Sequence, residues 1–166
     1  METTSFCGTP VGRIGITDDG RAVTRVFFSS QMEEGVESAL ARKTYDQLME
    51  YFEGRRRAFT IPLDPKGTVF QRRVWKALGE IPYGETRSYK QIAEQIGHPK
   101  AYRAVGLANN RNPIAILIPC HRVIGSNGTL VGYAGGLSVK ERLLQLEAGD
   151  RMQGKDGKAL RFEDEA

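Results

Sequence analysis

The chain has 166 residues, of which 40% are hydrophobic and 27% charged, a composition typical of a soluble globular protein with one ordinary domain or two small ones. No apolar stretch approaches the roughly 20 residues of a membrane span, and residues 1–5 lack the features of a signal peptide, so we expect a cytoplasmic protein without membrane association. The cysteines, Cys7 and Cys120, and the two histidines have no metal-ligand spacing, so we predict free thiols and no metal or other cofactor.

The net charge of +4 is unevenly distributed. Residues 1–64 carry eight Lys/Arg against ten Asp/Glu, a net charge of −2, and residues 65–150 carry twelve against six, a net charge of +6. Residues 151–166, a predicted polar tail, carry four of each. The basic excess therefore lies in the segment that holds Cys120. A basic surface attracts polyanions such as DNA, although an ordinary solvated face would show the same excess.

Residues 1–64 are predicted to form a small α/β domain. Its first three strands, separated by short turns, are expected at residues 3–7, 12–17 and 22–28. Asp18-Asp19-Gly20 is a hairpin signal between the last two of them. Residues 37–52 place apolar side chains on one helical face, and Gly54 ends that helix. Residues 58–63 are predicted to add one more short strand. Since no residue here suggests chemistry, we interpret this domain as a scaffold.

Residues 65–150 are predicted to form a mainly α-helical domain with two capping boxes at helix starts. Thr68 with Gln71, and Ser88 with Gln91, each place a hydroxyl at the N-cap and an amide three residues later. A turn at Gly97-His98-Pro99 separates the second of these helices from a further helix at residues 100–109. Together they have the pattern of a helix-turn-helix.

The second helix of that pair is unusually slim. Small residues dominate it, and Tyr102 and Arg103 are the large projections near its start. A recognition helix in the major groove normally reads bases with polar side chains, and this helix has few to offer. Taken alone, Arg103 would equally be a solvated helix arginine.

Five apolar residues, 114–118, lead into Pro119 and then Cys120, His121 and Arg122. Nearby cationic groups can lower a cysteine pKa from about 8.5 towards roughly 3.5–7.5, so we interpret Cys120 as a reactive thiolate and not as an inert core residue. Successive side chains of a strand point to opposite faces, so His121 acts on Cys120 only if the chain turns or through a water. Pro119 favours such a turn.

Pro119-Cys120-His121-Arg122-Val123 resembles the signature of the O6-alkylguanine-DNA alkyltransferases, also called methylated-DNA–protein-cysteine methyltransferases. The resemblance is close over residues 65–148 and extends only to the general layout of residues 1–64, where it implies a ribonuclease-H-like α/β domain. It implies a monomeric enzyme without a cofactor that binds double-stranded DNA containing O6-alkylguanine through the minor groove. The implied function is DNA repair, in which the alkyl group is transferred once and irreversibly to Cys120. O4-alkylthymine is a further expected substrate.

The resemblance also implies which residues bind DNA. Arg103 would replace the flipped base in the stack, with Ala101 and Gly106 on the same slim helix and Arg111 at its end, where relatives often have glycine. Tyr89 would press on the 3′ phosphate and serve as a hydrogen-bond donor to the leaving guanine. Tyr89 could also be a simple core aromatic.

The remaining implied roles concern the pocket and the proton relay. Asn112 matches the asparagine hinge that links the helix-turn-helix to the cysteine segment. Tyr133-Ala134-Gly135 matches the substrate-pocket loop, and Ala134 stands where some relatives have serine, so a hydroxyl contact to the base is lost. Glu147 matches the acid that orients His121, which would draw the thiol proton through water. Outside this resemblance Glu147 would be expected at the surface.

Two other classes of function stay open from the residues alone. One is a DNA-binding module without chemistry, such as a regulator or a lesion-recognising relative; a cysteine at position 120 argues against the latter, whose members carry a different residue there. The other is a cysteine hydrolase that uses Cys120 and His121. It would need an oxyanion hole, and it would leave the helix-turn-helix unexplained.

Overall fold

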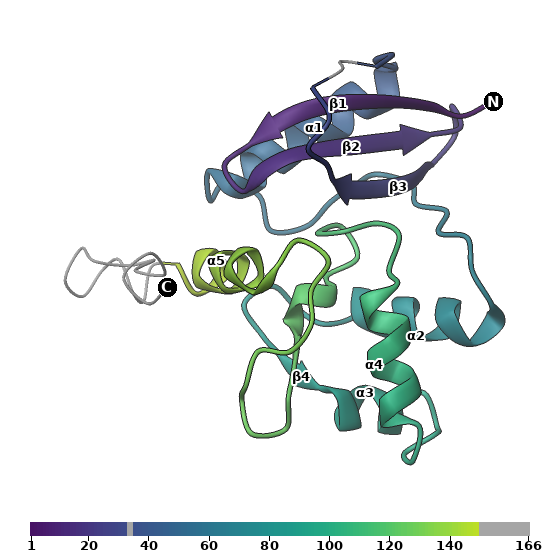
Figure 1. Ribbon diagram of the computed structural model, residues 1–166, viewed down its shortest axis with the longest axis vertical. Coiled ribbons are helices and arrows are strands. Elements are labelled where there is room, and N and C mark those ends of the chain that lie inside the picture. Colours follow the sequence, from purple (N-terminus) through teal and green to yellow (C-terminus); the bar gives the residue numbers. More distant parts are fainter. Residues whose placement is uncertain (33–34, 150–166) are drawn as a thin grey trace.

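The structure is a computed structural model that describes residues 1–32 and 35–149 (Figure 1). Its N-terminal part is an antiparallel sheet in the order β1-β2-β3, with one helix packed against the sheet. The elements are β1 (Thr3–Thr9), β2 (Gly12–Asp18), β3 (Val23–Phe28) and α1 (Ala39–Phe52). The three predicted strands and the helix are therefore confirmed.

The predicted hairpin between β2 and β3 is also confirmed. The carboxylate of Asp18 accepts from the backbone N–H of Gly20, and that of Asp19 accepts from Arg21 and Ala22, each at 2.9 Å. Gly20 has a φ of +91°, which favours glycine. Short polar side chains thus close the turn by binding their own backbone.

Residues 58–63 do not form the predicted strand. Only Leu63 makes a bridge, to Val23 of β3. Pro62 has no N–H to donate to a neighbouring strand, and the N–H of Thr60 donates to the side-chain oxygen of Gln47 at 3.0 Å. The segment is therefore an extended connection between the two halves of the molecule.

The C-terminal part is mainly helical, and residues 137–148 return from it towards the N-terminal domain (Figure 1). Its elements are α2 (Val69–Gly79), β4 (Arg87–Ser88), α3 (Tyr89–Gln95), α4 (Tyr102–Asn110), the 3-10 helix η1 (Cys120–Arg122), β5 (Val123–Ile124) and α5 (Leu137–Ala148). Both capping boxes are confirmed, before α2 and before α3. The helix expected from residue 100 begins two residues later, and its N-cap, Ala101, makes no side-chain capping hydrogen bond. Within the described part of the chain no helix is both long and apolar enough to cross a membrane.

The outer edge of β3 joins the two domains. The N–H of Val26 donates to the carbonyl of Pro113, and the N–H of Ala115 donates back to Val26, both at 2.9 Å. Apolar residues 114–118 are buried at this junction and extend one core from the sheet to the helices. Ile116 has a φ of +71°, a strained conformation for a β-branched residue. The cysteine segment is therefore a bent chain held between the domains.

Candidate active site

Cys120 lies where the chain turns. It opens η1 directly after Pro119, and the side chains of Cys120, His121 and Arg122 are all buried. The turn expected at Pro119 is thus present, and a 3-10 helix replaces an extended strand. Neighbouring residues in such a turn are not forced onto opposite faces, so the imidazole and the thiol can share one site.

The carboxylate of Glu147, on α5, is the centre of this site and is not at the surface. Its side chain is 1% exposed. Oε2 accepts from His121 Nε2 at 2.7 Å and from Arg122 Nη2 at 3.0 Å, while Oε1 accepts from Arg122 Nε at 2.8 Å and from the N–H of Gly84 at 3.3 Å. A further donor to Oε2 is the hydroxyl of Tyr51, at 2.6 Å. Glu147 therefore holds His121 and Arg122 in place.

These contacts keep Glu147 charged. Burial alone would raise its pKa, but the hydrogen bond and charge of His121, followed by those of Arg122, lower the pKa from 4.5 to about 2. A buried carboxylate is stable only with such partners. Glu147 is therefore an anion at every pH at which the protein functions.

The tautomer of His121 follows from that anion. Because the charged carboxylate can only accept, Nε2 carries the proton and Nδ1 has the lone pair. Nδ1 is buried and makes no hydrogen bond to any atom of residues 1–32 and 35–149. Burial lowers the pKa of His121 and outweighs the opposite effect of Glu147, so the imidazole is neutral at pH 7. It is thus prepared to accept a proton at Nδ1.

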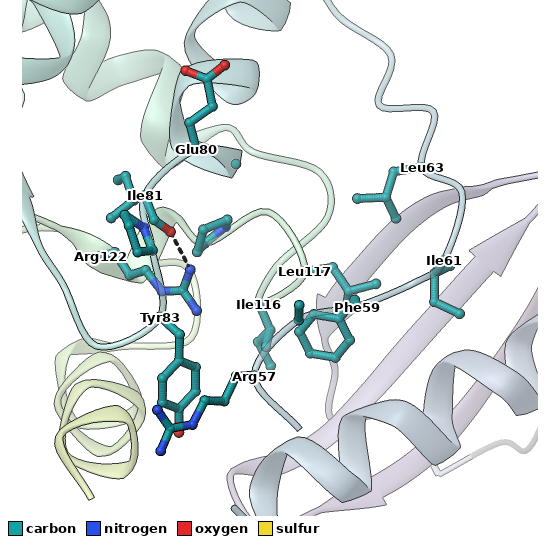
Figure 2. A pocket seen from close by; sticks show the side chains of 14 residues that line it. Arg57, Phe59, Ile61, Leu63, Glu80, Ile81, Tyr83, Ile116, Leu117 and Arg122 are labelled. Carbon is teal, nitrogen blue, oxygen red and sulfur yellow. Dashed lines mark hydrogen bonds between the residues drawn. The ribbon is translucent and has the colours of Figure 1, made fainter. Parts of the chain in front are cut away.

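The thiol of Cys120 is protonated at rest. Burial raises its pKa, and the side chain of Asn112 and the charge of Lys140 offset only part of that effect. Arg122 does not face the thiol, because its guanidinium binds Glu147 and the carbonyl of Ile81, the latter at 2.7 Å (Figure 2). The prediction that the neighbouring basic residues make Cys120 a thiolate is therefore wrong for the resting protein. To act as a nucleophile, the thiol would first have to lose its proton.

Asn112 binds the backbone on both sides of the bend. Its Nδ2 donates to the carbonyls of Ile118 at 2.8 Å and Ile114 at 3.2 Å, and its Oδ1 accepts from the N–H of Ile114 at 3.0 Å. This geometry is that of a clamp between α4 and the cysteine segment. Arg111, just before it, has a φ of −100°, so the position does not require the glycine of other relatives.

Two of the expected pocket residues, Tyr89 and Tyr133, lie near the thiol, because burial and then the charge of Cys120 raise the pKa of each hydroxyl. Tyr89 is half-buried, and its hydroxyl donates to the carbonyl of Val131 at 3.0 Å. The hydroxyl of Tyr133 is buried and its ring packs edge-on against Phe28 of β3, with ring centroids 5.9 Å apart. A Cβ at position 135 would lie 2.8 Å from the same Phe28 ring, so Gly135 allows this close approach. Ala134 is exposed.

A cavity of about 190 Å³ lies next to this loop, between β3 and the hinge. Phe28, Asn112, Ala115 and Ala134 are among the residues that line it. A larger cavity of about 280 Å³ lies on another side of the cysteine segment, between the connection at residues 57–63 and residues 116–119 (Figure 2). Open space therefore exists on two sides of the cysteine segment, and Cys120 itself lines neither of these two cavities.

The residues expected to bind DNA lie on and beside α4. Arg103 and Arg111 are exposed, and Leu107, between them at helical spacing, is 54% exposed. Ala101 is the N-cap of the helix. Gly106 faces α3, where an added Cβ would lie 3.7 Å from the ring of Tyr89. The structure thus gives α4 an exposed face with two arginines, and Gly106 lies towards its partner helix.

Sequence reasoning missed two residues of the site. Lys140 is completely buried on α5, its Nζ donates to the carbonyl of Val131 at 2.9 Å, and burial lowers its pKa to about 8 despite the nearby Cys120. Its spacing from Leu143 and Glu147, which share the buried face, was the available signal. The sequence contains no comparable signal for Tyr51, which lies in the part that we interpreted as a scaffold. That interpretation is incomplete.

Comparison with known proteins places this arrangement in a family. Residues 69–149 match the DNA binding domain of 6-O-methylguanine DNA methyltransferase, and residues 4–65 match its ribonuclease-like domain. The chain belongs to this family. The expected fold class, an N-terminal ribonuclease-like domain followed by a helical DNA-binding domain, is thereby confirmed.

Individual relatives agree with the family assignment. The chain is 67% identical over 106 residues to a methylated-DNA–protein-cysteine methyltransferase of Methanosarcina barkeri, covering 64% of this chain and 67% of the relative. It is 50% identical over 145 residues to the enzyme of that name from Mycobacterium leprae, covering 84% and 88%. The structure of Mycobacterium tuberculosis OGT in complex with DNA superposes with a TM-score of 0.81 at 48% identity, covering 87% of this chain and 91% of that one.

The buried charge of Glu147 generates a prediction about stability. Glu147→Gln should lower the free energy of unfolding at pH 7 by about 3–5 kcal/mol, because it leaves the buried Arg122 without its carboxylate. A carboxyl with a depressed pKa stabilises the fold above its unfolded pKa, near 4.5, and this contribution disappears as the pH falls through about 2. Urea unfolding at pH 7 and pH 2.5 should therefore show a smaller effect at the lower pH.

The matched control is Glu94→Gln, which changes an exposed glutamate on α3. It should alter stability by less than about 0.5 kcal/mol. Equal effects of the two substitutions at pH 7 would contradict a structural role of the Glu147 charge.

Proposed function

We propose that this protein repairs DNA by transferring the alkyl group of O6-alkylguanine, and also of O4-alkylthymine, to the sulfur of Cys120 in a single irreversible reaction. The observation that carries the proposal is the buried Cys120 next to a His121 that Glu147 holds in its proton-accepting tautomer. Membership of the methyltransferase family supplies the substrate class. The proposed protein acts as a monomer in the cytoplasm, where a reducing environment would keep Cys7 and Cys120 as free thiols.

The protein first binds duplex DNA through α4, in the minor groove. The exposed Arg103 enters the stack in place of the damaged nucleotide, and Arg111 contacts the backbone. An alkylated base inside the stack cannot be reached, so it must swing out of the duplex towards Cys120, into a pocket formed by the loop of Tyr133 and Ala134. Phosphate contacts position the helix without reading sequence, which suits a protein that must act at any damaged guanine.

Within the pocket the sulfur attacks the alkyl carbon. A carbon–sulfur bond forms while the bond between that carbon and O6 breaks, and its electron pair stays on guanine. The thiol proton passes through water to Nδ1 of His121, and Glu147 stabilises the imidazolium. The hydroxyl of Tyr89 exchanges its hydrogen bond to the carbonyl of Val131 for one to the guanine anion, and backbone N–H groups near Ala134 donate further hydrogen bonds to that anion. The thioether is a poor leaving group, so each molecule acts once.

Cys120→Ser tests the nucleophile. The variant should show no mass increase after incubation with an O6-methylguanine duplex and should still bind the duplex, since a hydroxyl is a far weaker nucleophile at neutral pH. Intact mass spectrometry checks this result. Cys7→Ser is the matched control. It should acquire one methyl group, because it changes a residue of β1 and keeps Cys120. A methylated Cys120→Ser protein would exclude Cys120 as acceptor, and turnover without an adduct would favour the hydrolase.

Arg103→Ala tests whether Arg103 takes the place of the flipped base in the stack. It should slow the repair of duplex DNA at least tenfold more than the repair of free O6-alkylguanine, because only the duplex requires a stabilised flipped state. Arg42→Ala, which changes an exposed arginine of α1, should affect neither reaction. Single-turnover rates with both substrates provide the measurement. Equal slowing of the two reactions by Arg103→Ala would exclude the insertion role.

His121→Ala tests the proton acceptor. With a neutral His121 in the wild type, the transfer rate should be nearly constant from pH 7 to pH 8. In the variant the thiol must ionise unaided, so the rate at pH 7 should fall by about 10²–10⁴-fold and then rise with pH. Single-turnover rates from pH 6 to pH 9 and DNA affinity at pH 7 check this. Parallel pH profiles for the two proteins would exclude the relay.

A further inference from the structure

The helix of the N-terminal domain reaches into the catalytic centre. Tyr51, near the end of α1, is completely buried, and its hydroxyl donates to Oε2 of Glu147 at 2.6 Å. His121 Nε2 binds the same oxygen at 2.7 Å. We propose that Tyr51 is a positioning residue: through its hydrogen bond to Glu147, the N-terminal domain sets the orientation and the basicity of His121. The consequence for alkyl transfer rests on the proposed function.

The Tyr51 ring is fixed by aromatic neighbours from both domains. Its centroid lies 5.4 Å from that of Phe52, 5.5 Å from that of Phe59 and 6.1 Å from that of Tyr83. Such offset and edge-on contacts hold a ring in one orientation. Burial, followed by the charge of Glu147, raises the pKa of Tyr51 well above its ordinary value, so the phenol remains a donor at every relevant pH. The hydrogen bond to Glu147 is therefore a permanent part of the folded protein.

The hydroxyl and the imidazole share one oxygen, and this determines the sign of the effect. Each donor to Oε2 delocalises part of the negative charge that would stabilise a protonated His121. Removing the Tyr51 hydroxyl leaves Arg122 Nη2 as the other donor to that oxygen. The carboxylate then attracts the imidazolium more strongly, and His121 becomes more basic.

Other groups that act on His121 stay unchanged by this substitution. Burial is the largest influence and lowers the pKa of His121; Glu147 raises it, and the charges of Arg122 and Lys140 lower it. Glu147 and Lys140 come from α5, and Arg122 from the same turn as His121. Cys120 precedes His121, and Tyr83 lies over Arg122. The Tyr51 hydroxyl donates to Glu147, so a change in the pKa of His121 after its removal reports on this hydrogen bond.

The chain offers a direct measurement and a matched control. It contains two histidines, so ring-¹⁵N-labelled histidine gives two titration curves, and the exposed His98, in the turn after α3, is an internal reference. Tyr51→Phe should raise the pKa of His121 by at least half a unit and leave that of His98 unchanged. Tyr45→Phe removes a hydroxyl from the same helix, one that donates to the carbonyl of Gly8 at 3.0 Å, and should change neither.

A second variant keeps the test decisive if Tyr51→Phe folds poorly. Site-specific 3-fluorotyrosine at position 51 retains the ring and the hydroxyl but is a stronger donor, so the pKa of His121 should fall. Opposite shifts from the two changes would support the proposal. An unchanged His121 in both, or the same shift in Tyr45→Phe, would overturn it.

The alkyl-transfer assay separates this inference from the proposed function. In single-turnover reactions the acid limb of the pH–rate profile should shift upwards in Tyr51→Phe together with the His121 titration, while DNA affinity stays constant. A titration shift without a matching rate shift would overturn the positioning role. Absence of transfer by the wild-type protein would overturn the proposed function, and the His121 titration would still decide whether Tyr51 acts on this residue.

Discussion

The buried carboxylate of Glu147 is the interaction on which the site depends. An ion removed from water costs several kcal/mol unless donors replace its hydration. Here the donors come from α1, from the loop at Gly84 and from the turn η1, which are far apart in the sequence. The charge is tolerated only when all three have docked against α5. The complete site therefore needs the two domains packed together, because Tyr51 comes from one and Gly84 and Arg122 come from the other.

The same burial keeps the nucleophile inactive until it is needed. Both thiols have raised pKa values, that of Cys7 at about 11, and burial is the main cause in each case. A permanent thiolate would react with any electrophile or oxidant, and a protein that acts once cannot recover from that loss. A neutral thiol next to a neutral imidazole avoids this. In the proposed reaction the sulfur becomes a strong nucleophile when its proton passes to His121.

Sequence reasoning succeeded where the interacting groups are neighbours in the chain. The capping boxes at Thr68 and Ser88 and the turn after Asp18 each involve residues within three positions. It failed where the direction of a side chain mattered. That Arg122 follows Cys120 in the sequence could not show that its guanidinium turns towards Glu147 and not towards the thiol. Tyr51 is 96 positions from Glu147, and no periodicity or motif relates them. The role of Glu147 itself came from the family resemblance and not from its local pattern.

The division into a scaffold and a catalytic domain describes the sequence better than it describes the site. At one end β3 binds the backbone on both sides of Ile114 through Val26, next to the hinge at Asn112, and at the other end α1 binds Glu147. Between these anchors Ile116 holds a left-handed backbone that costs on the order of 1–3 kcal/mol. Such strain persists only if the surroundings impose it, and here the sheet edge and the Asn112 side chain do so. The bend that brings Cys120 to the clamp of Asn112 is therefore maintained by the N-terminal domain as much as by the helices of the C-terminal domain.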